Sequence, residues 1–84
     1  MNGHLEIDHR AERELASLPD AILQRIVTKI QTLVENPFPR GIKKLKGTSG
    51  YRLRVGDYRV LYDVYPRERK IVIYAAGHRR DIYR

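Results

Sequence analysis

The 84-residue sequence contains no cysteine and no tryptophan, and only three histidines. Without thiols, neither a disulfide framework nor a thiolate metal site can form. No paired carboxylates accompany the scattered histidines, and no glycine-rich phosphate loop is present, so we expect neither a metal nor a cofactor. The longest apolar run, Ile71 to Ala76, is too short for a bilayer, and acidic side chains in residues 1–18 exclude a signal peptide. These absences predict a soluble, cytoplasmic protein that does not contact a membrane.

Charge is the most informative property that is present. The formal net charge is +7, but residues 1–39 carry four basic and six acidic side chains, whereas residues 40–84 carry thirteen basic and four acidic ones. Basic charge gathered in one half suits a phosphate-binding face, because each neutralised phosphate releases counterions and adds affinity. The alternative is a merely soluble basic surface. The asymmetry favours a nucleic-acid partner.

The length predicts one domain over residues 1–84, because there is no internal repeat and too little chain for two cores. A domain of this size buries only about 60–65% of the surface of its unfolded chain. Its core should therefore be a thin layer between helices and a sheet, with no deep cofactor cavity.

The first half of the chain reads as a strand followed by two helices. His4 to Ile7 can form a short strand, and Asp8 can cap the first turn of the helix that follows. Pro19 separates this helix from a second one and suits its first position, where a missing N–H costs nothing. The second helix should end at Asn36-Pro37. Apolar residues recur at helical spacing in both segments: Ala11, Leu15 and Leu18 in the first, then Ile22, Leu23, Ile26, Val27, Ile30, Leu33 and Val34.

The second half reads as a loop and three strands. Residues 37–50 have the prolines, glycines and lysines of a loop. Strands are predicted at 51–55, 58–65 and 71–76, with turns at Gly56-Asp57 and at residues 66–70. The expected fold is α+β: an N-terminal strand and a two-helix hairpin packed on one face of an antiparallel sheet with a three-stranded C-terminal meander. The other face of the sheet is then left open.

Period-two alternation places arginines on that open face. It separates Arg52 and Arg54 from the apolar residues of the first meander strand and adds Arg59 from the second strand. The tail from Gly77 onward can fold back over the same face. Alternating arginines can also be no more than a solvated strand face. We expect the tyrosines of the meander to fill core or half-buried positions: Tyr58, Tyr62 and Tyr74.

Four ordered segments carry a resemblance to a known family. They are Leu45-Lys46-Gly47, Tyr51-Arg52-Leu53-Arg54, Gly56-Asp57-Tyr58-Arg59-Val60-Leu61-Tyr62 and Gly77-His78-Arg79-Arg80-Asp81-Ile82-Tyr83. In this order, after two helices joined at Leu-Pro, they resemble the RelE/ParE superfamily of toxins. The resemblance covers nearly the whole chain and implies the RelE-like fold.

In RelE-like members the resemblance implies a ribosome-dependent endoribonuclease that cuts mRNA in the A site and inhibits translation. The ribose 2′-OH attacks the adjacent phosphate, which leaves a 2′,3′-cyclic phosphate and a free 5′-OH. This chemistry needs no metal, but it needs a proton acceptor, cations for the phosphorane and a proton donor for the leaving oxygen.

The matching positions assign a role to each candidate residue. Arg52 and Arg54 stand at the basic sheet positions, one of which is proposed as the general base. Arg59 stands at the phosphate-clamping arginine, Arg79 at the tail arginine that serves the leaving group, and Tyr83 at the terminal tyrosine that stacks on a base or orients the 2′-OH. A further set of basic residues would contact RNA or rRNA phosphates: Lys43, Lys44, Lys46 and Arg80.

One departure from the family pattern concerns the general base. The best-known member carries lysines where this chain has Arg52 and Arg54, and a guanidinium is a poor proton acceptor because its pKa exceeds about 12. Three answers stay open: His78, since imidazole is a common proton acceptor in enzymes, a ribosomal group, or water alone. We expect electrostatic stabilisation by the arginines to be the larger contribution, with His78 as a possible proton carrier.

Two other functions compete with the nuclease. A ParE-like protein of the same fold would inhibit DNA gyrase without cutting RNA, and a catalytically weakened relative would only bind nucleic acid. ParE-like chains generally lack the full set of sheet arginines together with a tail tyrosine, which favours the nuclease over the gyrase inhibitor. Arginine at both Arg52 and Arg54 keeps the weakened relative open. The expected partners are a small acidic RelB-like antitoxin that orders on binding, mRNA and rRNA on the 70S ribosome, and operator DNA only through the antitoxin complex.

Overall fold

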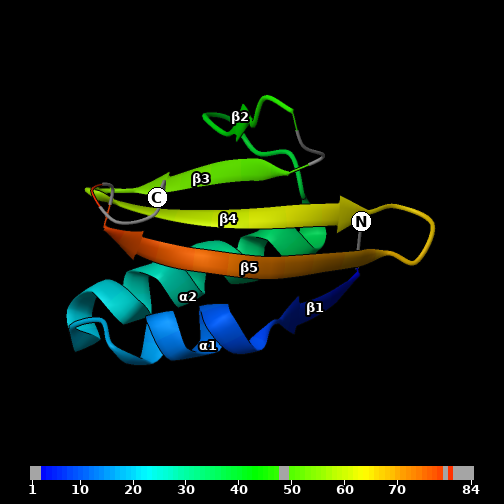
Figure 1. The fold of residues 1–84 in the computed structure, drawn as a ribbon. Coiled ribbons are helices and arrows are strands. Elements are labelled where there is room, and N and C mark those ends of the chain that lie inside the picture. The colour runs from blue at the N-terminus through cyan, green and yellow to red at the C-terminus, as the bar shows by residue number, and fades with distance from the viewer. Residues whose placement is uncertain (1–2, 48–49, 79, 81–84) are drawn as a thin grey trace.

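A computed structural model of the protein describes residues 3–47, 50–78 and 80. Its elements follow the chain as five strands and two helices (Figure 1): β1 (His4–Ile7), α1 (His9–Ala16), α2 (Asp20–Glu35), β2 (Lys43–Lys44), β3 (Tyr51–Val55), β4 (Tyr58–Tyr65) and β5 (Lys70–His78). The predicted α+β class is confirmed, and so are the predicted bounds of β1, β3 and β4.

The strands form one sheet in the order β1-β5-β4-β3-β2. The antiparallel meander of β3, β4 and β5 is as predicted. One detail differs from the predicted antiparallel sheet: β1 pairs with β5 in parallel, so the sheet is mixed. The helical hairpin carries the chain away from β1, and the meander brings it back beside that strand. The four residues of β1 form a pattern that predicts a strand, but this pattern does not indicate whether the neighbouring strand runs parallel or antiparallel to it.

The predicted loop and the last strand also differ from the structure. A two-residue strand, β2, forms inside the predicted loop and pairs with β3, with Lys43 opposite Arg52. The last strand runs to His78 instead of ending at Ala76, so the start of the predicted tail belongs to the sheet. A bulge lies within this strand, because Tyr62 pairs with Ile73 and Leu61 with Ala75, which leaves Tyr74 as the extra residue.

Both helices lie on the same side of the sheet (Figure 1), where the main core forms. The predicted cap of α1 is confirmed, since Asp8 Oδ1 accepts a hydrogen bond from the Ala11 amide at 2.9 Å. Pro19 occupies the N-cap of α2 instead of its first helical position. The most completely buried side chains join α2 to the sheet: Tyr62, Ile26, Ile30, Leu33, Ile71, Ile73 and Val60.

The outer face of the sheet is not fully open, contrary to the expectation from sequence. Leu61 and Ala75 point away from the helices, and they are covered by Leu45 and Tyr74 in a small second apolar cluster. Leu45 follows β2 directly, so the segment after α2 is anchored on the outer face. In the sequence Leu45 stands alone among lysines, and this pattern gives no sign that its side chain packs on the sheet.

None of the helices that the structure describes is both long and apolar enough to cross a membrane.

Candidate nucleic-acid interface

Three arginines lie on the outer face of the sheet, as the alternation predicted. On β3, Tyr51, Leu53 and Val55 join the core beneath, so Arg52 and Arg54 point outward. Arg52 is half-buried and Arg54 is exposed. The antiparallel register places Arg54 directly opposite Arg59 of β4. The outer face therefore brings together Arg52, Arg54 and Arg59, and we call this surface the arginine face.

The β3–β4 turn holds one of these arginines in place. Arg54 Nε donates a hydrogen bond to the Gly56 carbonyl oxygen at 3.2 Å. Gly56 has a φ of 61°, a left-handed conformation that costs a glycine little. From the other side of the turn, the Arg25 guanidinium reaches Gly56, with Nη1 and Nη2 3.7 and 3.8 Å from the position that a Cβ would occupy. Sequence reasoning missed Arg25, because its place between Ile22 and Ile26 on a helix marks only a solvated position.

The predicted RNA-binding lysines border this face at the β3 edge. Lys43 and Lys44 pair with Arg52 and Tyr51, and both lysines are exposed. The turn that follows is closed by a hydrogen bond from the Leu45 amide to the Gly50 oxygen, at 3.0 Å. Lys46 lies in this turn and is also exposed. The lysines thus extend the cationic surface beyond the arginines.

His78 lies on the opposite face of the sheet from the arginines. Its strand neighbour is Tyr58, and the two rings meet edge to face with centroids 5.4 Å apart. His78 Nδ1 accepts a hydrogen bond from the Arg80 amide at 3.3 Å. The bulge at Tyr74 explains this placement, because one extra residue inverts the side that later side chains face. The structure does not bring His78 together with the sheet arginines.

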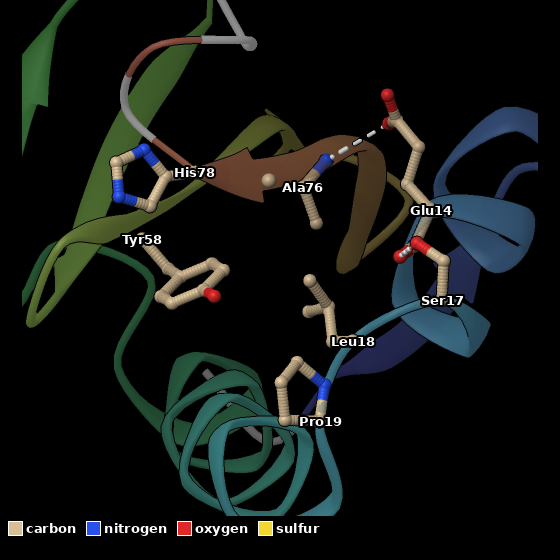
Figure 2. A pocket seen from close by; sticks show the side chains of 8 residues that line it. Glu14, Ser17, Leu18, Pro19, Tyr58, Ala76 and His78 are labelled. Carbon is tan, nitrogen blue, oxygen red and sulfur yellow. Dashed lines mark hydrogen bonds between the residues drawn. The ribbon is translucent and has the colours of Figure 1, made fainter.

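A shallow pocket of about 310 Å³ adjoins His78. Figure 2 shows the Tyr58 and His78 rings on one side of it and side chains from α1 and the α1–α2 connection on the other. The lining residues are Glu14, Ser17, Leu18, Pro19, Tyr58, Ala76, Gly77 and His78. Of the other tail residues, Arg80 is exposed, while Arg79 and Tyr83 lie outside the described residues.

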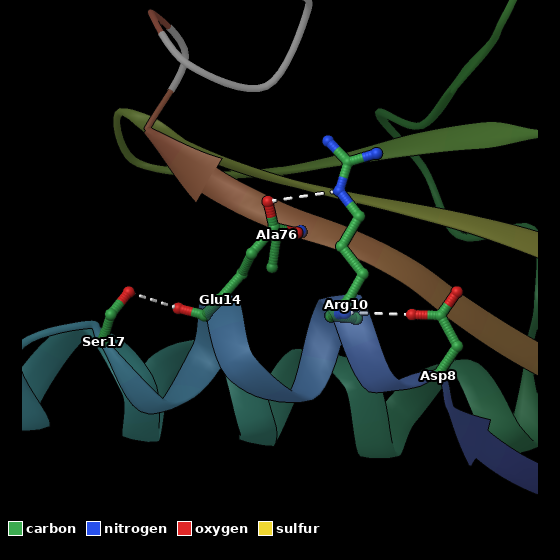
Figure 3. A network of polar contacts seen from close by, with 6 residues as sticks. Asp8, Arg10, Glu14, Ser17 and Ala76 are labelled. Atoms are coloured by element: carbon green, nitrogen blue, oxygen red, sulfur yellow. Dashed lines mark hydrogen bonds and ion pairs between the residues drawn. The ribbon is translucent and has the colours of Figure 1, made fainter.

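A polar network ties α1 to the strand beside this pocket (Figure 3). Glu14 Oε1 accepts a hydrogen bond from the Ala76 amide at 3.1 Å, and Glu14 Oε2 lies 3.5 Å from Arg10 Nε. The register of β1 with β5 stops at Ile73, so Ala76 lies on an edge of β5 that β1 does not cover. Glu14 therefore replaces a missing strand partner, a role that sequence reasoning did not assign.

Tyr62 lies beneath the arginine face as part of the core. It is 0% exposed, its ring stacks on Tyr51 with centroids 5.7 Å apart, and its hydroxyl donates to the Pro37 oxygen at 2.8 Å. Burial, with a smaller contribution from Tyr51, raises the pKa of Tyr62 to about 12. The hydroxyl therefore stays protonated at neutral pH. This confirms the core position expected for the tyrosine, and Tyr58 and Tyr74 are half-buried.

Among the residues that the structure describes, no three histidine, cysteine, aspartate or glutamate side chains gather in a group that could hold a metal ion.

Comparison with known proteins gives a consistent family. A family model described as the ParE toxin of the type II toxin–antitoxin system parDE matches residues 5–83. A homologue named toxin RelE1, from Methanocaldococcus jannaschii, is 36% identical across the whole chain and 98% of its own length. The archaeal RelE of a RelE–RelB complex from Pyrococcus horikoshii OT3 is 34% identical with a TM-score of 0.83, covering 94% of this chain and 97% of that one.

A more distant structure has the same fold. A chain of the toxin–antitoxin complex RelBE2 from Mycobacterium tuberculosis is 27% identical with a TM-score of 0.83, and the match covers 93% of this chain and 99% of the other. The family model is named for ParE, whereas these relatives are named for RelE. Together with the two-helix, five-stranded fold, these matches show that the chain belongs to the RelE/ParE superfamily of type II toxin–antitoxin toxins.

Proposed function

We propose that this toxin is a metal-independent endoribonuclease that binds the 70S ribosome, cleaves mRNA in the A site and so inhibits translation. One observation carries the proposal: Arg54 and Arg59 face each other across β3 and β4, with Arg52 on the same outer face, in a chain whose relatives are RelE toxins. Three cations on one surface suit a phosphate whose charge grows in the transition state.

The proposed reaction begins with attack of the ribose 2′-OH on the adjacent phosphate. The P–O bond to the 5′ oxygen then breaks, which leaves a 2′,3′-cyclic phosphate and a free 5′-OH. Arg52, Arg54 and Arg59 stabilise the phosphorane, and guanidinium groups suit its oxygens because they donate in pairs. Arg79 serves the leaving oxygen, and Tyr83 stacks on a base or orients the 2′-OH. Exposed basic residues hold the RNA or rRNA backbone: Lys43, Lys44, Lys46 and Arg80.

Geometry and chemistry together narrow the candidates for the proton acceptor. Arg52 and Arg54 are poor acceptors, since guanidinium groups stay protonated at neutral pH. His78 faces the helix side of the sheet, and its Nδ1 already accepts the Arg80 amide. This arrangement favours water or a ribosomal group as the acceptor of the 2′ proton. His78 then holds the start of the tail through the hydrogen bond that it accepts from the Arg80 amide. The variant His78→Ala tests whether His78 also carries a proton in the reaction.

The proposed protein partner is a small acidic RelB-like antitoxin. Relatives of the same fold were crystallised as complexes with RelB. A basic outer face attracts an acidic chain electrostatically, and such a chain would cover the arginines that bind RNA. Operator DNA would be contacted only through that complex.

The experiment is in vitro translation of a defined mRNA, with the toxin added in the presence and absence of 70S ribosomes. Primer extension maps the ends of the mRNA. We expect a ribosome-dependent cut within the A-site codon, and Arg59→Ala and Arg54→Ala should each slow it by roughly 10²- to 10³-fold, as expected for one lost transition-state donor. The matched control is Arg67→Ala, because Arg67 is exposed in the β4–β5 connection at the other end of the sheet.

A DNA gyrase inhibitor is the second candidate function, and the match to the ParE family model supports it. If mRNA stays intact and translation is undisturbed, while DNA supercoiling by gyrase is inhibited, the nuclease is refuted and the gyrase inhibitor is supported. Intact mRNA and active gyrase would point instead to a relative that only binds nucleic acid.

A further inference from the structure

A cation from the helical layer reaches the β3–β4 turn, which lies at one end of the outer face that carries the arginines. Arg25 extends from α2, and its two terminal nitrogens lie 3.7 and 3.8 Å from the position of a Cβ on Gly56. Arg54 approaches the same residue from β3, with its Nε 3.2 Å from the Gly56 oxygen. Two guanidinium groups from different elements thus lie beside one turn residue, and that of Arg54 is hydrogen-bonded to it.

At this turn the basic side chains outnumber the one carboxylate that the turn contains, that of Asp57. Arg59 lies opposite Arg54 in the sheet, which adds a third basic residue at this end. Neither Arg25 nor Arg54 forms an ion pair within the described part of the chain, and the same holds for Asp57 in the turn itself. Like charges held together repel one another, and a bound anion relieves the repulsion.

We propose that Arg25 and Arg54 form a phosphate-binding site at the β3–β4 turn that holds the RNA backbone next to the position of cleavage. The inference rests on the proposed nuclease function and adds a residue from outside the sheet. Arg54 and Arg59 face the outer side, whereas Arg25 comes from the helical layer, so the cationic surface continues around the end of the sheet. Arg25 is a binding residue and not a catalytic one, because it reaches the turn from the face opposite the reacting phosphate.

The test measures RNA binding and cleavage separately on Arg25→Gln, Arg25→Lys and a matched control, Arg13→Gln. Arg13 is an exposed arginine of α1 without an ion pair among the described residues. Binding of a short single-stranded RNA is followed by fluorescence anisotropy over a range of salt concentrations. Cleavage is followed under single-turnover conditions on ribosomes programmed with a defined mRNA.

For Arg25→Gln we expect about 5- to 20-fold weaker RNA binding, which is the effect of one charge-assisted phosphate contact. The slope of log K against log salt should fall by about 0.7, the value for one phosphate of a single strand. The half-saturating ribosome concentration should rise, while the maximal cleavage rate stays within about twofold because the reacting phosphate is untouched. Arg25→Lys should recover most of the salt slope, and Arg13→Gln should behave as wild type.

The inference is overturned if Arg25→Gln and Arg13→Gln bind RNA equally well. It is also overturned if Arg25→Gln lowers only the maximal rate, or weakens only the binding of an acidic antitoxin. If the wild-type protein cuts no mRNA, the proposed nuclease is refuted. The anisotropy measurement would still show whether Arg25 contributes to RNA binding. The two failures are therefore distinguishable.

Discussion

Replacing Tyr62 with phenylalanine removes one oxygen from the centre of the fold. The hydroxyl of this fully buried side chain donates to the Pro37 oxygen at 2.8 Å, which joins β4 to the segment that follows α2. Pro37 is itself buried, so its carbonyl would lose its partner without gaining water. An unsatisfied buried acceptor costs about 1–2 kcal/mol. Tyr62→Phe should therefore be less stable than wild type by this amount at neutral pH.

The difference in stability between wild type and Tyr62→Phe should vanish or change sign in alkaline solution. Burial raises the pKa of Tyr62 from 10.0 to about 12, so the folded protein keeps the proton that the unfolded chain releases. Stability from this group is complete below pH 10 and is lost as the pH rises through 12. Two pKa units correspond to roughly 2–3 kcal/mol. Phenylalanine has no proton to lose, so the variant escapes this loss.

Urea unfolding, followed by circular dichroism at neutral pH and between pH 10 and pH 12, measures both effects. The control is Tyr65→Phe, since Tyr65 ends β4 and is 42% exposed. That variant should follow the wild-type pH dependence. A stability difference between wild type and Tyr62→Phe that is the same at neutral and alkaline pH would refute the reasoning from burial.

Substitutions at three further positions, with Val27→Ala as a control, test the fold by urea unfolding. Asp8→Ala removes the α1 cap and should cost about 1 kcal/mol, whereas Asp8→Asn should retain most of the stability, because its side-chain oxygen can still accept the Ala11 amide. Leu33→Ala empties a 0% exposed core position and should cost about 3 kcal/mol, and a cost below about 1 kcal/mol, the value expected for Val27→Ala on the exposed face, would contradict its core role. Gly56→Ala strains a φ of 61° and should cost about 1 kcal/mol, so an unchanged stability would mean that the turn relaxes.

Local patterns were enough to predict much of the arginine face. Alternation along β3 separates Arg52 and Arg54 from the core residues, because successive side chains of a strand point to opposite faces. The turn at Gly56-Asp57 is so short that Val55 must pair with Tyr58, and Arg54 therefore with Arg59. The six consecutive residues 54–59 therefore determine the register of this hairpin.

The position of His78 could not be predicted in the same way. Counting by twos from Ile71 assigns residue 78 to the outer face, and the bulge at Tyr74 reverses this assignment. The bulge depends on how β5 packs against β4 and the helices, and no residue type marks it. The tail from Gly77 was expected to fold back over the arginines, whereas its first described residues lie at the pocket with Tyr58.

The sequence by itself determined both helices, the strands β1, β3 and β4, the α1 cap, the β3–β4 hairpin and the outward arginines, because each depends on residues close together in the chain. Only the tertiary structure decided that β1 joins β5 in parallel, that Glu14 bonds to Ala76, and that Arg25 reaches Gly56. Each of these contacts joins segments about 30 to 70 residues apart. Such contacts are selected by the packing of the whole core, and no local pattern of residues encodes them.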